Sequence, residues 1–320
     1  MSIEQKGTRT TPRLDLGEAF MEFIDQQSLF IGTKVLPIFK STKMDGKFSA
    51  ITRESLTRDV DTKRAMRGKY NREGVGTEEK SFKCQEHGLE GPLDDGERDL
   101  YASDFDAELV TTQQVGGLVL LGQEKRASAK LFDTSVFTGT PLYTDVSAAP
   151  WDAVGSDAIG QVKAAREKVR QNCGLEPTDL VISKTNLDRL TANTAIRAAI
   201  QYVARLTEAE IINALADILG VKKIKIGSAV RNTANKGKAF SGADVWSDDY
   251  ALLAVVADEG QNLAQPSIGR TFLWVTQTPD NAMVEQYRED SINSDIFRVR
   301  QFVDENVIDE NFGHLLKVDA

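Results

Sequence analysis

The chain contains few of the residues from which catalytic and metal sites are usually built. Among its 320 residues there are two cysteines and two histidines. Cys84 and Cys173 form no Cys-x-x-Cys pair, which disfavours a zinc site, a redox motif and a disulfide framework. Neither His87 nor His314 lies in a nucleophile motif such as Gly-x-Ser-x-Gly. The sequence therefore predicts no catalytic residue, no metal ligand and no cofactor, and we interpret the chain as a non-enzyme.

Long apolar segments are also lacking. The longest unbroken apolar run, Ala251 to Ala257, is far too short to span a bilayer. The N-terminus has no apolar run after its first charges and does not resemble a signal peptide. A net charge of -9 and a pI near 5.0 disfavour a general nucleic-acid binder, whose footprint is basic. We expect a soluble protein of a reducing compartment that enters no membrane.

One pair of glycines has the spacing of a phosphate-binding loop without its chemistry. Gly117 and Gly122 are followed by Gln123 and Glu124, where a lysine and a serine would be needed. A carboxylate beside a bound phosphate would repel it, so this interpretation is excluded.

A long stretch from residue 41 to residue 80 is too polar to form a core of its own. Its 40 positions hold 17 charged and 10 apolar residues, whereas the whole chain is 27% charged and 41% hydrophobic. Such composition favours disorder or a functional loop. The flanks 47–53 and 81–85 have the alternation of short strands, with glycines for turns between them. We therefore predict an extended hairpin that protrudes from a globular body.

Charge of opposite sign is separated along the chain. From Lys34 to Arg72 there are 11 basic and 4 acidic residues, and from Leu89 to Val110 there are 8 acidic residues and one arginine. Charge runs are usually solvated faces. The alternative is that the basic arm of one copy lies on the acidic surface of another, which would set specificity and association rate more than stability.

Two helices are expected in the first half of the chain. An amphipathic helix is expected to pack either on the protein's own core or on a partner, with one face formed by Leu16, Ala19, Phe20, Phe23 and Ile24. A long spine helix is predicted to end near Phe132, with Ser103 and Asp106 at the spacing of a capping box. Gly116 and Gly117 interrupt this helix and indicate either a kink or the close approach of a neighbour.

An α/β pattern follows Trp151. Ser156 is the expected cap of a helix that ends at Gly174, and a capping box at Thr207 opens another helix that ends at Gly220. A buried strand is expected at 180–182 and another strand at 223–226. Further strands are expected at 244–246, 251–256, 271–275, 284–287 and 297–303.

The order of these segments resembles one known family. The motifs that carry the resemblance are 35–39, 46–48, the acidic Leu93-Asp94-Asp95-Gly96-Glu97-Arg98, 123–126 with 131–132, 177–183 before 186–190, 219–227 and 271–274. Each motif is weak alone, but together they resemble tailed-bacteriophage major capsid proteins of the Hong Kong-type fold over nearly the whole chain.

The resemblance implies an α+β subunit with four parts. These are an N-terminal arm (1–38), an extended β-hairpin loop (39–92), a peripheral domain with the spine helix and C-terminal strands (93–150 and 269–320), and an α/β axial domain (151–268). It further implies self-assembly as hexamers and pentamers into an icosahedral shell that encloses double-stranded DNA. The chain would then be a virion protein, assembled in the bacterial cytoplasm.

The charge pattern and the resemblance together predict contacts between subunits. The candidate contact residues are Lys47, Arg53, Arg58, Lys63, Arg64, Arg67, Lys69, Asp94, Asp95, Glu97 and Asp99. Because no long extension precedes the arm, a separate scaffolding protein is expected, together with a portal and, as an option, decoration proteins.

Two alternatives stay open on the sequence alone. An encapsulin-like bacterial nanocompartment would have the same fold around a protein cargo. From another class, a soluble enzyme would use an unrecognised carboxylate site, for which Asp94, Asp95 and Glu97 are the nearest candidates, although a solvated acidic loop is the favoured interpretation.

Overall fold

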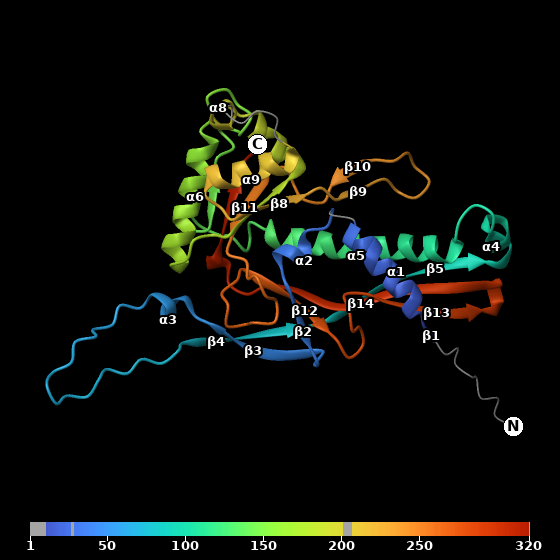
Figure 1. The fold of residues 1–320 in the computed structure, drawn as a ribbon, viewed down its shortest axis with the longest axis horizontal. Helices are drawn as coiled ribbons and strands as arrows, with labels where there is room; N and C mark the ends of the chain where they lie inside the picture. Colours follow the sequence, from blue (N-terminus) through green and yellow to red (C-terminus); the bar gives the residue numbers. More distant parts are fainter. Residues whose placement is uncertain (1–10, 27–28, 201–206, 320) are drawn as a thin grey trace.

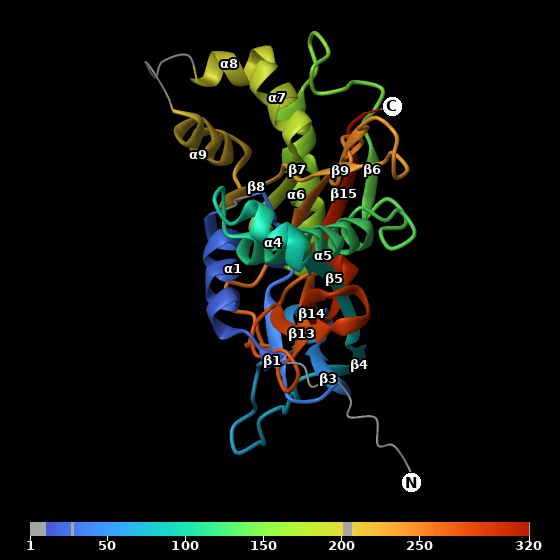
Figure 2. The same cartoon turned by 90° about the vertical axis from the view of Figure 1, so that its right-hand side faces the viewer.

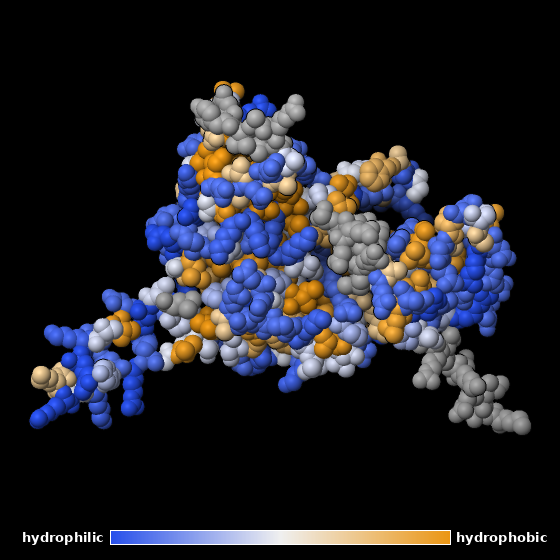
Figure 3. All heavy atoms as spheres, in the orientation of Figure 1, coloured by the Kyte–Doolittle hydropathy of each residue, from blue (hydrophilic) through white to orange (hydrophobic). Residues whose placement is uncertain are grey.

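The molecule is flat, with one long helix across its middle. The computed structural model describes residues 11–26, 29–200 and 207–319. Helix α5 separates a mixed α/β part from a sheet, and a slender hairpin arm leaves the body at the lower left of the view (Figure 1). The quarter turn shows how narrow the body is (Figure 2). In the space-filling view the arm is mostly hydrophilic (Figure 3).

Helix α5, Ala107–Leu131, is the predicted spine helix, but its cap differs from the prediction. The side chain of Asp106 accepts hydrogen bonds from Glu108 N and Leu109 N and is the N-cap. Ser103 was the wrong choice because Asp104 N and Phe105 N both bond to Tyr101 O and close the turn that ends the preceding helix.

Helix α1, Leu14–Gln26, packs on this spine helix of its own chain. The ring of Phe20, which is fully buried, lies over Gly116. A Cβ at Gly116 would be 2.2 Å from Phe20 Cζ, whereas one at Gly117 would meet nothing within 4 Å. Of the two explanations offered for this glycine pair, close approach is confirmed for Gly116. The predicted positions Phe23 and Ile24 lie among side chains outside those described.

The sheet below the spine helix is built around β14, Ser294–Val307. One of its sides pairs with β5, Gln85–Asp94, and the other with β13, Met283–Glu289, and then with β12, Gly269–Trp274. The short β1, Thr11–Pro12, extends it beyond β13, and β2, Ile38–Ser41, runs parallel to β12. The arm therefore begins and ends in this six-stranded sheet.

A five-stranded sheet forms the centre of the axial part. Its order is β6 (Tyr143–Asp145), β15 (Gly313–Lys317), β11 (Tyr250–Ala254), β7 (Asp179–Ser183) and β8 (Lys223–Gly227). The helices around it are α6 (Ala158–Cys173), α7 (Lys184–Ala192), α8 (Thr194–Ile200) and α9 (Glu208–Leu219). The remaining elements are α2 (Gly32–Val35), β3 (Asp45–Ile51), α3 (Arg53–Thr57), β4 (Thr77–Lys83), α4 (Asp95–Tyr101), β9 (Val230–Asn232), β10 (Gly242–Asp244) and the 3-10 turns Asp290–Ile292 and Glu310–Phe312.

Local sequence signals fix most of these helix ends. Gly174 and Gly220 end α6 and α9 in the left-handed conformation, with φ of 75° and 72°, and the Thr207 capping box is present. The cap of α6 is Asp157, whose carboxylate accepts from Gly160 N. Ser156 was predicted there, but its hydroxyl is buried and donates to Ala149 O instead.

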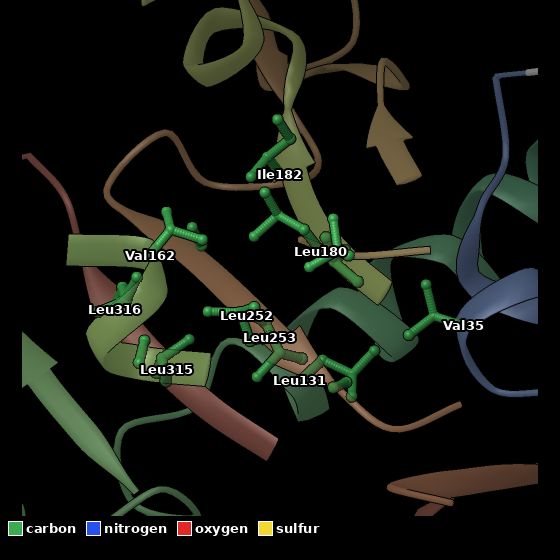
Figure 4. Packing of buried hydrophobic residues seen from close by; sticks show 14 of the residues in the cluster. Val35, Leu131, Val162, Leu180, Ile182, Leu252, Leu253, Leu315 and Leu316 are labelled. Carbon is green, nitrogen blue, oxygen red and sulfur yellow. The ribbon is translucent and has the colours of Figure 1, made fainter. Parts of the chain in front are cut away.

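The apolar residues form three separate clusters. The largest lies around the five-stranded sheet and includes Val35 of the arm segment and Leu131 of the spine helix (Figure 4). A second joins α1, α5 and the six-stranded sheet, and a third gathers Phe82, Cys84, Phe272 and Phe302 at the root of the arm. Each part of the subunit thus has apolar packing of its own, which gives it a defined position relative to the spine helix.

Some strands pair in a different part of the subunit from the one that the predicted domain boundaries assigned to them. Residues 85–92, expected in the extended loop, lie in β5 of the six-stranded sheet. Tyr143–Asp145 and Gly313–Lys317, expected in the peripheral domain, are strands of the axial sheet. A boundary read from chain order does not reveal such pairing, because the C-terminus returns to a strand far away in sequence. The division into four parts itself stays a prediction.

Candidate assembly surfaces

The arm starts as a regular hairpin. Strands β3 and β4 pair antiparallel from Asp45↔Lys83 to Ile51↔Thr77, as the alternation at 47–53 and 81–85 predicted. Only Phe82 of β4 is buried, so most of this two-stranded sheet is solvated. A two-stranded sheet is marginal in water unless something else supports it.

Aromatic side chains supply that support at the root. The ring of Phe82 stacks on Phe272 of β12, with centroids 4.5 Å apart and planes at 4°. Phe48 of β3 and Phe39 of β2 contact the same Phe272 ring at centroid distances of 5.0 and 5.4 Å. Aromatic pairs add about 0.5–1.5 kcal/mol each beyond the burial of area. The arm therefore leaves the body in a fixed direction.

Beyond the hairpin the arm is an irregular loop, whose two limbs are joined by an ion pair and a hydrogen bond. Arg58 pairs with Glu73 at 2.8 Å, and Asn71 Nδ2 donates to Asp61 O at 2.8 Å. Both contacts join the outgoing limb to the returning limb. The composition that suggested disorder is thus compatible with a structured loop.

The tip of the arm presents apolar side chains to solvent. Met66 is fully exposed at 101% and Tyr70 at 70%, and Val75, next to the end of the β3–β4 hairpin, is 72% exposed. The guanidinium of Arg64 lies over the Tyr70 ring, 4.4 Å from its centroid, and Arg64 Nε donates to Gly68 O at 2.7 Å. Exposed apolar groups on an ordered projection mark a contact surface.

The predicted basic contact residues divide into two groups. Lys47 pairs with Glu79, Arg58 with Glu73, and Arg53 donates to Asn311 Oδ1 at 2.8 Å, so these three serve contacts within the subunit. The second group is Lys63, Arg64, Arg67 and Lys69, which are exposed near the tip and form no ion pair within the described ranges. This second group is the basic tip of the arm.

The acidic candidates likewise divide. Asp95 forms a bidentate pair with Arg288, with both oxygen–nitrogen distances 2.6 Å, which holds the pKa of this carboxyl below its usual value. Asp94 caps α4 through Gly96 N. Glu97 and Asp99 are exposed and have no ion pair in the part of the chain that is described. The acidic surface at α4 is therefore smaller than the sequence count implied.

Apolar groups surround these free carboxylates. Leu100 is 68% exposed, Phe105 44% and Ile292 47%, and all three belong to the end of the peripheral part. The α4 end, which we define as Glu97, Asp99, Leu100, Phe105 and Ile292, combines apolar area with negative charge. The basic tip of the arm combines apolar area with positive charge, so the two surfaces are complementary.

Sequence reasoning missed the role of Glu124, a buried carboxylate that accepts three hydrogen bonds. Its carboxylate is buried on the spine helix and accepts hydrogen bonds from Ile31 N at 2.8 Å, Gly32 N at 2.7 Å and Trp246 Nε1 at 2.6 Å. Burial raises the pKa of Glu124, while the three donors favour its charged form. One side chain thus joins the start of α2, the spine helix and the axial part. The signal in the sequence that could have revealed this role was an acidic residue within the apolar face of the spine helix.

A second missed residue is Arg270, which is buried and has no carboxylate partner among the residues that the structure describes. Its guanidinium donates to the backbone oxygens of Gly260, Asn262, Gln265 and Gly269 at 3.1–3.3 Å. Burial lowers its pKa to about 10. Arg270 fixes the loop before β12 in one shape.

The histidines and cysteines have structural surroundings. His314 Nδ1 donates to Pro141 O at 2.8 Å, and its Nε2 lies 2.9 Å from Thr144 Oγ1, which also accepts from Lys168 Nζ. Burial lowers the pKa of His314 to about 4. Both cysteines are buried and free, and burial raises the pKa of Cys84 to about 12, so this thiol stays protonated.

The described ranges, 11–26, 29–200 and 207–319, contain neither a metal-binding cluster nor a membrane-spanning helix. Within these ranges, no cluster of three or more histidine, cysteine, aspartate or glutamate side chains is placed to hold a metal ion. Among the same residues, no helix has the length and apolar character needed to cross a membrane.

The fold of this chain is similar to that of solved phage proteins. A phage-related protein from Bordetella bronchiseptica RB50 superposes with a TM-score of 0.73 at 21% identity, over 97% of this chain and 98% of that one. The capsid of cyanophage P-SCSP1u superposes with a TM-score of 0.56 at 12% identity, over 100% and 93% of the two chains. The chain has the Hong Kong-type capsid fold. The α+β architecture inferred from the sequence is thereby confirmed.

One curated relative extends the likeness to sequence. The major capsid protein of Burkholderia phage BcepMu is 26% identical over 276 residues, which are 84% of this chain and 86% of that protein. No protein-family model matches the chain. The resemblance to phage major capsid proteins therefore covers both fold and sequence along most of the subunit.

Proposed function

We propose that this chain is the major capsid protein of a tailed phage and builds the head as hexamers and pentamers around double-stranded DNA. The observation that carries the proposal is the 26% identity to a phage major capsid protein over 84% of the chain. The alignment covers 84% of this chain and 86% of that protein, so the likeness extends over most of the subunit.

The tip of the arm is the surface through which we expect the subunit to contact a second copy of the chain. It is ordered, apolar and basic, and it lies away from the body. The α4 end carries the complementary apolar and acidic groups. We propose that the basic tip of one subunit binds the α4 end of a neighbour, with Lys63, Arg64, Arg67 and Lys69 facing Glu97 and Asp99.

The direct test is electron microscopy of the purified full-length protein, alone and with candidate scaffolding protein from the same genome. Closed icosahedral shells are the expected result. Particles filled with a protein cargo and no DNA in the native host would favour the encapsulin-like alternative. A discrete small oligomer under every condition would favour the enzyme alternative.

Scaffolding protein, portal and decoration proteins are proposed partners on the same basis, as is assembly in the bacterial cytoplasm before release in the virion. Mass spectrometry of immature particles tests the scaffold. A separate scaffold predicts a second abundant protein there, and a longer precursor of this chain in its place would contradict that part of the proposal.

A further inference from the structure

The hairpin of β9 and β10 is a second projection of the subunit. Its strands pair from Val230↔Asp244 to Asn232↔Gly242, and within the described ranges no third strand joins them. Both strand edges keep free backbone donors and acceptors. A two-stranded hairpin of this kind is only marginally stable in water unless its ends are held.

Both ends of this hairpin are held. Trp246, fully buried just after β10, packs on Gly227, where a Cβ would lie 2.2 Å from indole Cδ1. At the tip, Asn232 Oδ1 accepts from Ala234 N and from Ser241 N, each at 3.0 Å. Because the hairpin is preformed, a partner can bind it with little cost in ordering the chain.

One face of the hairpin is apolar and uncovered. Phe240 is 72% exposed and Val230 51% exposed. A Cβ at Gly242 would lie 3.0 Å from Phe240 Cε1 and 3.5 Å from Val230 Cγ1, so the ring and the valine methyl flank a position without a side chain. The outward face consists of Val230, Gly242 and Phe240, with the exposed carboxylate of Asp244 at its edge, because Asp244 pairs directly opposite Val230. Exposed aromatic area of this kind is typical of protein–protein contacts.

The charge of the hairpin is opposite to that of the remaining chain. Arg231, Lys236 and Lys238 are basic, and no acidic residue lies between Arg231 and Ala243. With Asp244 at the end of β10 counted, the hairpin contributes +2 to an overall charge of -9, so the rest of the chain carries -11. A second copy of this chain therefore presents a mainly acidic surface to it.

The direction of the hairpin also favours a second copy. In the broad view of the flat molecule the arm leaves toward the lower left, and the hairpin leaves the axial part toward the right (Figure 1). In a closed ring with head-to-tail contacts, one side of each subunit meets the opposite side of the next. A projection that leaves one side of the subunit in the plane of such a ring would face a neighbouring subunit.

We propose that the outward face of the β9–β10 hairpin, with Lys236 and Lys238 beside it, binds the adjoining side of the next copy in the ring. This contact is separate from the arm and rests on the proposed shell function. Its location on the axial part gives each subunit a second link to its neighbour.

The first test places a photoreactive amino acid at Phe240 of the full-length chain and irradiates assembled shells. A covalent dimer of this chain is expected from shells and not from dilute subunits, and the same probe at Thr233, on the opposite face of the hairpin, is expected to give at least tenfold less dimer. No dimer from intact shells, or an adduct that nuclease removes, would overturn the proposal, the latter in favour of a DNA contact.

The second test reverses charge on the hairpin. The double variant Lys236→Glu with Lys238→Glu is expected to lower shell yield at least tenfold, with the melting temperature of the subunit unchanged. The matched control, Lys125→Glu with Lys163→Glu, changes net charge equally at two exposed helix positions. Equal yields from both variants would overturn the hairpin contact while leaving the shell function intact. Absence of shells from the unaltered chain would instead contradict the shell function itself.

Discussion

At the scale of single residues, Glu124 has the most demanding surroundings. A buried carboxylate needs donors, and here two come from the start of α2 and one from Trp246. The approach is close, since a Cβ at Gly32 would lie 2.7 Å from Glu124 Oε2. A carboxylate with three donors and no salt-bridge partner is suited to holding three segments in one place.

Replacing this carboxylate by an amide tests its role. In Glu124→Gln, one oxygen acceptor becomes a donor that faces an N–H group, so we expect a loss of roughly 1.5–3 kcal/mol in the free energy of unfolding. Urea denaturation measures this loss. Glu97→Gln, at an exposed position, is the control and should change stability by less than about 0.5 kcal/mol. Equal effects from the two variants would show that Glu124 has no special role.

The pKa of His314 gives a second prediction. An unfolded chain binds a proton at this imidazole below pH 6.5, whereas the folded protein does so only near pH 4. The contribution of the neutral imidazole to stability is therefore complete above pH 6.5 and is lost as pH falls toward 4. Titration by NMR should show that His314 stays neutral at pH 5. An ordinary midpoint near 6.5 for both histidines would contradict the buried geometry.

At the scale of secondary-structure elements, the contact between α1 and α5 depends on one glycine of two. Gly116 lies under the Phe20 ring and Gly117 faces open space. The sequence showed the pair but not which member mattered, because the answer lies in a helix some ninety positions earlier. The same limit applies to Glu124, whose donors come from distant segments.

These neighbouring glycines form a matched pair of variants. Gly116→Ala should lower the free energy of unfolding by about 1–3 kcal/mol, since the added methyl overlaps a buried ring. Gly117→Ala should raise it by up to about 1 kcal/mol, because alanine is the better helix former. Thermal or urea unfolding distinguishes the two. A similar sign for both would mean that α1 does not pack as described.

Arm charge is the next element to test. Reversing Arg64, Arg67 and Lys69 together to glutamate should impair assembly and leave subunit folding unchanged, because these side chains have no ion pairs within the described subunit. The control keeps the charge, with both arginines changed to lysine and Lys69 to arginine. Shell yield by sedimentation and subunit melting by circular dichroism separate assembly from folding. Normal yield from the reversed variant would contradict the proposed arm contact.

At the scale of the whole molecule, local patterns predicted the elements better than their partners. The hairpin, the spine helix and the α/β order followed from periodicity, glycine and capping signals. The pairing of β15 with β11 and β6, and of β5 with β14, did not, since it depends on segments far apart in sequence. The same dependence on distant segments explains why the acidic surface at α4 is smaller than the sequence predicted. Counting carboxylates could not show that Arg288 neutralises Asp95.

Electron microscopy of the purified chain, with its scaffolding protein if one is required, tests the central claim most directly. Closed shells of hexamers and pentamers are expected, in which each basic arm tip crosses to the α4 end of a neighbour. A discrete small oligomer under all these conditions, with its arms free of other copies, would contradict it.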